Sequence, residues 1–271
     1  MYERFKKHNG RQQGFGEAMI KPLKHYKTKK VRVKGIPFEI RNGTCDMNVL
    51  DEVISNDCYR LEDIGLREAP NIIDVGGHIG AFTKYCAWRW PYLQIHTFEA
   101  NPSNWELIEK NVSDISHKVT LYKGAAVGRV PKNKKLVINK KEAATITGGW
   151  GIIFDDNADI KETENTATID IANFYSLSDI IKDMDKVDIL KLDCEGSEFS
   201  ILKALSDDEL YKVDYLVCEI HCGALPHHDW TYEEFRAKVL NQFICPELEA
   251  RPTCENHHIY NIVACNKKLL P

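Results

Sequence analysis

The segment that most restricts the fold is a glycine-containing loop, Asp74–Gly80, with the sequence Asp-Val-Gly-Gly-His-Ile-Gly. It follows an apolar run at residues 71–75 and precedes a helical pattern at residues 81–90, in which apolar side chains recur on one face. A strand, a glycine turn and a helix in this order predict the first part of a β-α-β unit. Glycine lets the main chain approach another group closely, and the start of a helix offers free N–H groups to an anionic ligand.

Strand-like and helix-like segments alternate after this loop. Apolar runs at residues 93–98, 119–123, 187–192 and 213–220 predict strands, and the stretches between them contain helical patterns. Strands that alternate with helices pair in parallel, so this order predicts an α/β fold with a parallel sheet. Upstream, residues 31–41 predict a hairpin around Lys34-Gly35, and residues 47–55 predict a helix. Residues 247–251 and 258–265 predict a closing antiparallel hairpin.

The same pattern divides the chain. We expect one main domain at residues 36–271, a basic arm at residues 1–35 and a hairpin insertion at residues 129–170, where the alternation is interrupted. The arm carries a formal charge of +9 and the rest of the chain −13, which gives the total of −4. A basic arm attracts anionic partners, but this one has few interleaved aromatic residues, so nucleic-acid binding is not predicted.

Composition excludes several classes of protein. Hydrophobic residues make up 43% of the chain and charged residues 28%, which is enough apolar material for a buried core. No apolar run has the length of a membrane-spanning helix, and residues 1–10 lack the apolar core of a secretion signal. The nine cysteines include no C-x-x-C pair, so we expect free thiols in the reducing cytoplasm.

A second feature narrows the choice of ligand. Glu99 ends the next predicted strand, nineteen residues after Gly80, where a carboxylate can accept both hydroxyl groups of a ribose. The dinucleotide-binding fingerprint needs a further glycine where this chain has Val75. The spacing of Asp74, Gly76 and Gly80 instead suits S-adenosylmethionine, which has an amino acid in place of a pyrophosphate. Loop N–H groups can then bind its carboxylate, while Asp74 orients the loop and attracts its ammonium group.

Four segments together resemble the FkbM family of methyltransferases. They are Ile73–Gly80 with Phe82-Thr83, Phe98–Pro102, Ala125–Gly128 and Ile189–Glu198. The last is the most specific, because Lys-x-Asp-x-Glu-Gly-x-Glu is rarely met by chance. Upstream, Arg41, Thr44–Asp46 and Tyr59 also resemble the family. Two positions depart from its pattern, since His78 stands where Asn is usual and Ala100 where Pro is usual.

The resemblance covers about residues 36–266 and implies a Rossmann-like class I methyltransferase fold with a doubly wound, mostly parallel seven-stranded sheet. It implies methyl transfer from S-adenosylmethionine to oxygen, often a hydroxyl of a sugar, a glycan or a small natural product. The cofactor-binding residues carried over from the family are Asp74, Gly76, Gly77, His78, Gly80, Phe82, Glu99, Ala100, Ala125 and Asp193. Among them, Asp74, Gly76 and Gly80 would hold the methionine part, which His78 can also reach. Glu99 would hold the ribose, and Ala125 would line the adenine pocket.

Acidic side chains and a histidine at the ends of two later strands predict the acceptor side of the site. They are Asp193 and Glu195 after one strand and Glu219 and His221 at the end of the next. Because parallel strands end at one edge of a sheet, we expect these groups to converge, with Asp193 or His221 taking the proton of a hydroxyl acceptor. In a stricter version, Glu195, Glu219 and His221 bind one divalent cation. Alternatively, Asp193 and Glu195 cap the following helix and His221 is a structural residue.

Two other functions remain open on the sequence. A nicotinamide-dependent oxidoreductase would use a similar sheet, although Val75 argues against it. A non-catalytic module would keep an adenosyl pocket and use the basic arm for a partner. A further alternative is that the glycine loop is only a structural turn and that Glu99 lies at the surface, in which case neither residue group binds a ligand. For the methyltransferase, we expect a small-molecule or glycan acceptor, while the sequence leaves the oligomeric state undetermined.

Overall fold

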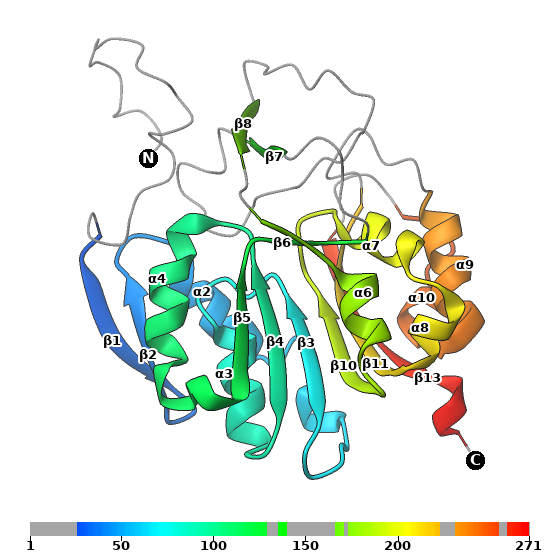
Figure 1. Ribbon diagram of the computed structural model, residues 1–271, viewed down its shortest axis with the longest axis horizontal. Coiled ribbons are helices and arrows are strands. Elements are labelled where there is room, and N and C mark those ends of the chain that lie inside the picture. The colour runs from blue at the N-terminus through cyan, green and yellow to red at the C-terminus, as the bar shows by residue number, and fades with distance from the viewer. Residues whose placement is uncertain are drawn as a thin grey trace.

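The computed structural model describes residues 26–128, 135–139, 166–170, 173–222, 231–254 and 259–270. At its centre is a seven-stranded sheet in the order β12-β13-β11-β10-β3-β4-β5 (Figure 1). The strands are β3 (Asn71–Val75), β4 (Gln94–Glu99), β5 (Val119–Lys123), β10 (Val187–Leu192), β11 (Val213–His221), β12 (Phe243–Ile244) and β13 (Ile259–Asn266). β13 runs antiparallel to β11 and β12, and the other neighbours pair in parallel. The predicted Rossmann-like, mostly parallel sheet is confirmed.

The sheet is wound in two directions from its middle. The chain proceeds from β3 through β4 to β5, and then returns to the other side of β3 with β10 and β11. The strand order therefore reverses between β3 and β10, which is where open α/β sheets bind ligands. The helices on one face are α2 (Asp46–Leu50), α3 (Ala81–Arg89) and α4 (Pro102–Asn111). Those on the other are α6 (Leu177–Lys182), α7 (Glu198–Ala204), α8 (Asp207–Tyr211), α9 (Tyr232–Gln242) and α10 (Pro246–Glu249).

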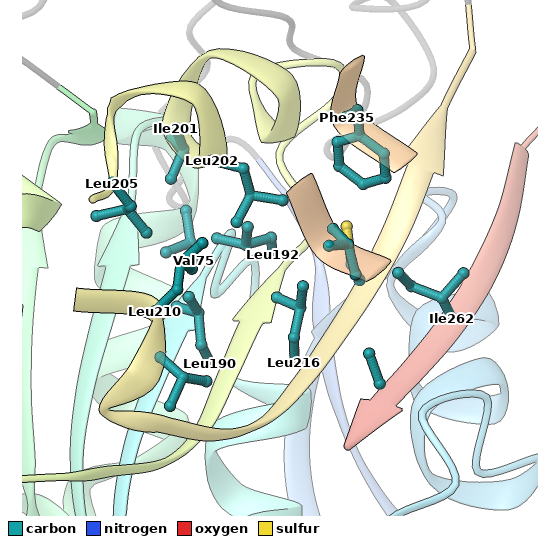
Figure 2. Packing of buried hydrophobic residues seen from close by; sticks show 14 of the residues in the cluster. Val75, Leu190, Leu192, Ile201, Leu202, Leu205, Leu210, Leu216, Phe235 and Ile262 are labelled. Atoms are coloured by element: carbon teal, nitrogen blue, oxygen red, sulfur yellow. The ribbon is translucent and has the colours of Figure 1, made fainter. Parts of the chain in front are cut away.

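Each face of the sheet carries its own hydrophobic core. In β3, Ile72 belongs to the core under α3, and the next residue, Ile73, belongs to the core on the opposite face. Side chains alternate in this way because successive residues of a strand point to opposite faces. Figure 2 shows the second core, in which Leu202 of α7 and Phe235 of α9 pack with side chains of β10 and β11. The mainly apolar sequence of β10, in which all six residues are buried, is therefore explained by burial on both faces.

The predicted N-terminal hairpin is confirmed. β1 (Thr28–Val33) pairs antiparallel with β2 (Ile36–Arg41), and the turn residues Lys34 and Gly35 have φ values of 46° and 82°. Two residues with positive φ are typical of the two-residue turn that matches strand twist. The hairpin lies beside α4 (Figure 1). The predicted helix that follows is also present, but its second half is the π-helix η2 (Asp51–Ser55), and the short helix η3 (Leu61–Asp63) comes next.

Smaller elements complete the described part of the chain. β6 (Ala125–Val127) pairs in parallel with β9 (Phe174–Ser176), and η4 (Ser113–Lys118) and η5 (Lys267–Leu269) are short helices. Within the predicted insertion, β7 (Lys135–Asn139) pairs antiparallel with β8 (Thr166–Asp170). The other residues of the insertion, and residues 1–25 of the predicted basic arm, lie outside the described residues.

Two predictions for the C-terminal region were wrong. Residues 247–251 are not a strand, since α10 occupies most of this segment, and β13 pairs with β11 and β12 instead. Pro246 occupies the first turn of α10, where the proline ring favours the start of a helix. Cys222 and Cys254 are not thiols but form a disulfide, whereas the other seven cysteines are outside any disulfide. Only tertiary structure brings these two positions together, because 32 residues separate them in the sequence.

Candidate active site

A cavity of about 400 Å³ lies at the carboxyl ends of the central strands, beside the point where the strand order reverses. Its volume falls in the range of about 300–1,000 Å³ that is usual for ligand pockets. Most of the residues predicted for the site line this cavity: Gly76, Gly77, His78, Phe82, Glu99, Ala100, Ala125, Asp193, Glu195, Glu219 and His221. Asp74 and Gly80 do not line the cavity. Both instead contact neighbouring parts of the protein.

The glycine loop is shaped by the strand ends behind it. Gly76 has a φ of 86°, and a Cβ at this position would collide with the carbonyl oxygen of Asp193. A Cβ on Gly77 would lie 2.5 Å from Cγ2 of Thr97. The N–H groups of both glycines donate to the carbonyl oxygen of Phe98, at 3.0 and 2.9 Å. The protein thus already uses the N–H groups of these two glycines, and the binding of a ligand carboxylate by other N–H groups of the loop or of the helix start stays a prediction.

Asp74 and Gly80 stabilise the loop from behind. Asp74 is fully buried, accepts a 2.7 Å hydrogen bond from Thr83 Oγ1 and lies 3.2 Å from the ammonium group of Lys191. Its charge is thus balanced inside the protein, which leaves the predicted attraction to a cofactor ammonium without support. A Cβ on Gly80 would lie 3.2 Å from Ile108 Cγ1, so this glycine allows close packing of the loop against α4.

Lys191 is a site residue that the sequence reasoning did not assign. Its buried ammonium group donates to the carbonyl oxygens of Val75 and Gly76, at 3.0 and 2.7 Å. Burial lowers the pKa of Lys191, but Asp74 and Asp193 raise it more, so the group stays protonated. The sequence did contain a signal, because a lysine within the apolar strand β10 requires buried partners. Lys191 ties β10 to the glycine loop of β3.

Glu99 is buried at the end of β4 with several donors around it. Its Oε2 accepts the N–H of His78 at 2.6 Å, and its Oε1 accepts the N–H of Asn101 at 2.7 Å and Nδ2 of Asn104 at 3.2 Å. Burial raises the pKa of Glu99 to about 7, although these hydrogen bonds oppose the shift. A carboxylate offers about four acceptor positions, so three protein donors leave capacity for a ligand hydroxyl. The alternative of a surface glutamate is wrong.

His78 closes the loop with an unusual backbone conformation. Its φ is 48°, which is uncommon for a residue with a side chain. Nε2 lies 3.6 Å from Oδ1 of Asp46, whose carboxylate is itself held by the guanidinium of Arg41 at 2.7 Å. Burial lowers the pKa of His78 to about 4, so its ring is neutral at physiological pH. The ring lines the cavity as a neutral polar group.

The residues predicted for the acceptor side of the site also lie close together. Ligand atoms of Asp193, Glu219 and His221 lie within 4.8 Å of one another. Burial raises the pKa of Asp193, but Lys191 and the other nearby donors lower it more. Burial and the charge of Asp193 raise the pKa of Glu219, so Glu219 holds the proton of their shared hydrogen bond.

His221 lies between two glutamates. Its Nδ1 is 3.1 Å from Oε1 of Glu198, and its Nε2 is 3.4 Å from Oε2 of Glu195. Burial lowers the pKa of His221, but Glu198 and Glu195 outweigh it and raise the pKa to about 10. The ring is therefore charged at neutral pH. The N-cap residue of α7 is Ser197, whose side chain makes no capping hydrogen bond, and the alternative in which Asp193 and Glu195 stabilise the start of this helix stays a prediction.

Part of the cavity lining was not predicted. Asn48 and Glu52 of the α2–η2 segment line the cavity, as does Tyr59. Tyr59 had been noted only for its family resemblance. No periodicity in residues 46–59 distinguishes side chains that face a cavity from side chains that face the core, so Asn48 and Glu52 could not be identified from the sequence.

Comparison with known proteins identifies the family. The family profile described as "Methyltransferase FkbM domain" matches residues 74–250, which include the glycine loop, Glu99 and the acceptor-side cluster. The chain belongs to the FkbM methyltransferase family. It is accordingly a methyltransferase, and the predicted family is confirmed.

Relatives of this FkbM-family enzyme are distant. "Methyltransferase 1" of Beauveria bassiana is 24% identical over 188 residues, which are 62% of this chain and 71% of that protein. "31-O-demethyl-FK506 methyltransferase FkbM" of Streptomyces tacrolimicus is 24% identical over 192 residues, 63% of this chain and 72% of that protein. A crystal structure of methyltransferase FkbM from Methylobacillus flagellatus KT aligns with a TM-score of 0.42 and 14% identity, covering 76% of this chain and 46% of that one.

Among the residues that the structure describes, no helix has the length and apolar character needed to span a membrane.

Proposed function

We propose that this FkbM-family enzyme transfers the methyl group of S-adenosylmethionine to a hydroxyl group of a sugar, a glycan or a small natural product. The observation that carries the proposal is that residues suited to bind a nucleoside and residues suited to bind a reacting hydroxyl group line the same cavity. Glu99 and Ala125 lie at one end of its lining, on the side of β4 and β5, while Asp193 and His221 come from β10 and β11. A nucleoside and a reacting hydroxyl group can thus be bound next to each other.

The residues present fit the adenosyl cofactor. In this proposal Glu99 accepts a ribose hydroxyl, for which its buried carboxylate has remaining acceptor capacity. Ala100 and Ala125 have small side chains and leave room for the adenine ring beside it. Gly76, Gly77 and His78 border the methionine part, and Phe82 lies beyond them in the cavity wall. Asp74 and Gly80 act indirectly, because they hold the loop in place.

The chemistry requires alignment and removal of one proton. The cofactor supplies a methyl group that its sulfonium already activates for displacement. The enzyme then has to hold an acceptor oxygen about 3–3.5 Å from that carbon and in line with it. As the new O–C bond forms and the S–C bond breaks, the hydroxyl proton passes to a base, and a positioned base typically contributes about 10²–10⁴-fold.

Asp193 is the base that the geometry favours. Its pKa is lowered, so it is ionised at neutral pH, and a hydroxyl that is being methylated is acidic enough to give its proton to such a carboxylate. His221 was the other candidate. It is already protonated between Glu195 and Glu198, so in this proposal it does not take a proton, and its positive charge helps to keep Asp193 ionised. Glu195 and Glu219 then orient His221 and Asp193.

A divalent cation is the remaining part of the sequence hypothesis. The residues that would hold it are Asp193, Glu219 and His221, whereas the sequence had proposed Glu195 in place of Asp193. Carboxylate and imidazole ligands suit Mg²⁺, Mn²⁺ or Zn²⁺, which would hold two acceptor hydroxyls. Dialysis against a chelator tests this part separately: unchanged methyl transfer rejects the cation, and a loss that Mg²⁺ or Mn²⁺ restores supports it.

The experiment for the main proposal uses purified full-length protein. Calorimetric titration with S-adenosylmethionine, S-adenosylhomocysteine and NAD tests the cofactor, and incubation with labelled S-adenosylmethionine and a cell extract tests the transfer. We expect adenosyl binding without NAD binding, and label in a hydroxyl-bearing acceptor. The Asp193→Asn variant should bind the cofactor normally and lose most turnover. NAD binding alone would point to an oxidoreductase, and adenosyl binding without transfer to a binding module.

The acceptor class and the cellular location are parts of the same proposal. A relative whose name specifies 31-O-demethyl-FK506 as its substrate supports an oxygen acceptor here. A cytoplasmic location stays a prediction, and the Cys222–Cys254 disulfide makes it testable, because disulfides are rare in reducing compartments. Alkylation of thiols in freshly lysed native cells would show whether this pair is oxidised there.

A further inference from the structure

Tyr59 makes a contact that the proposed chemistry does not yet use. Its hydroxyl donates a 2.7 Å hydrogen bond to Oδ2 of Asp193, across 134 residues of sequence. The ring is almost fully buried and packs edge-on against Phe82, with ring centroids 5.5 Å apart. The ammonium group of Lys191 lies 5.8 Å from the centre of the same ring. The hydroxyl is therefore held in one place by contacts on several sides.

The backbone around Tyr59 is built for this placement. Asp57 and Arg60 have φ values of 47° and 52°, which non-glycine residues rarely adopt. The Asp57 carboxylate holds the turn, because its two oxygens accept the N–H groups of Leu61 and Glu62, each at 2.9 Å. Strained backbone of this kind persists only where the surrounding structure fixes it, and it is concentrated at functional sites.

Asp193 is fixed on its other sides as well. Its main-chain N–H donates to the carbonyl oxygen of Val75 at 3.2 Å, and its own carbonyl oxygen occupies the space beside Gly76. Lys191 lies 3.6 Å from Oδ2, the same oxygen that Tyr59 contacts. Tyr59 and Lys191 thus both act on Oδ2, Glu219 shares a further hydrogen bond with the carboxylate, and the carboxylate lines the cavity.

We infer that Tyr59 is a positioning residue for methyl transfer: its hydroxyl anchors Oδ2 of Asp193 and so fixes the orientation in which the carboxylate meets the acceptor hydroxyl. This inference rests on the proposed function, in which Asp193 takes the acceptor proton. It predicts a separation of two effects. Removing the Tyr59 hydroxyl leaves Asp193 less firmly positioned and does not change the nucleoside end of the cavity. Methyl transfer should therefore fall while cofactor affinity is kept.

The test compares Tyr59→Phe with Tyr85→Phe in the full-length enzyme. Tyr85 is a matched control, because it is also buried and donates to a carboxylate, that of Glu62, but does not line the cavity. For Tyr59→Phe we expect transfer of labelled methyl groups to extract acceptors to fall by about 10- to 100-fold, the range that a small misplacement of a reacting group produces. The dissociation constant for S-adenosylmethionine, measured by calorimetry, should change less than about twofold. Tyr85→Phe should keep wild-type transfer.

A double variant decides whether the effect passes through Asp193. Tyr59→Phe should add little to the loss caused by Asp193→Asn, because coupled residues are not additive. The inference would be overturned if the two losses of transfer multiply in the double variant, or if Tyr59→Phe alone leaves transfer unchanged. It would also be overturned if Tyr59→Phe loses cofactor binding and thermal stability together. Failure of the wild-type enzyme to transfer any label would instead refute the proposed function, so the two failures are distinguishable.

Discussion

Replacing Glu99 by Gln tests the nucleoside end of the cavity most directly. The substitution keeps the size of the side chain but removes its charge and turns one acceptor oxygen into a donor. A hydrogen bond to a charged group contributes about 1.5–3 kcal/mol. Loss of one such bond to a ribose hydroxyl should therefore weaken S-adenosylmethionine binding by about 10- to 150-fold. Because Oε2 of Glu99 also accepts the N–H of His78, the loop should lose stability as well.

The pH dependence of binding gives an independent signature. Burial raises the pKa of Glu99 to about 7 in the free protein, so a growing fraction is protonated below that pH. A protonated carboxyl group has lost one acceptor oxygen, so affinity should fall as the pH decreases. Between pH 8 and pH 6 the wild-type dissociation constant should rise by about tenfold, and the Gln variant should lack this dependence.

Calorimetric titrations at pH 6, 7 and 8 measure both effects. Glu106→Gln is the control, since it removes an equal charge from the exposed side of α4, where Glu106 pairs with Lys110. It should bind the cofactor like the wild type. Wild-type affinity in Glu99→Gln, or the same pH dependence in both proteins, would show that Glu99 does not hold the ribose. Thermal unfolding of each variant separates lost binding from lost folding.

Three further predictions concern stability. Gly76→Ala should lower the free energy of unfolding by more than about 3 kcal/mol in urea titrations, because the methyl group meets a main-chain carbonyl at a positive φ; an unchanged midpoint would mean that the loop relaxes freely. Arg41→Met should cost about 3–5 kcal/mol by removing the guanidinium that balances the charge of the buried Asp46 carboxylate, and the double variant with Asp46→Leu should recover part of it. Reducing the Cys222–Cys254 disulfide should lower the free energy of unfolding by about 4 kcal/mol, and identical melting with and without reductant would contradict the pairing.

The sequence was most informative where local chemistry and spacing agree. The alternation of strands and helices and the hairpin around Lys34-Gly35 both depend on residues close together in the chain. The glycine loop and Glu99 were also found in this way, because they end neighbouring strands of one β-α-β unit. These local signals were sufficient to predict the sheet and the location of the cavity.

Other features depend on segments that meet only after folding. Sequence reasoning assigned the glycines of the loop to a ligand, yet it is the end of β10 that excludes a side chain at Gly76. The partner of Asp74 is Lys191, and the hydroxyl of Tyr59 reaches Asp193 from more than a hundred residues away. Spacing along one chain determines which residues can share a strand or a helix face. The packing of separate elements decides which charged side chains lie together in the interior. The interaction partners of the site residues were therefore determined only by the tertiary structure.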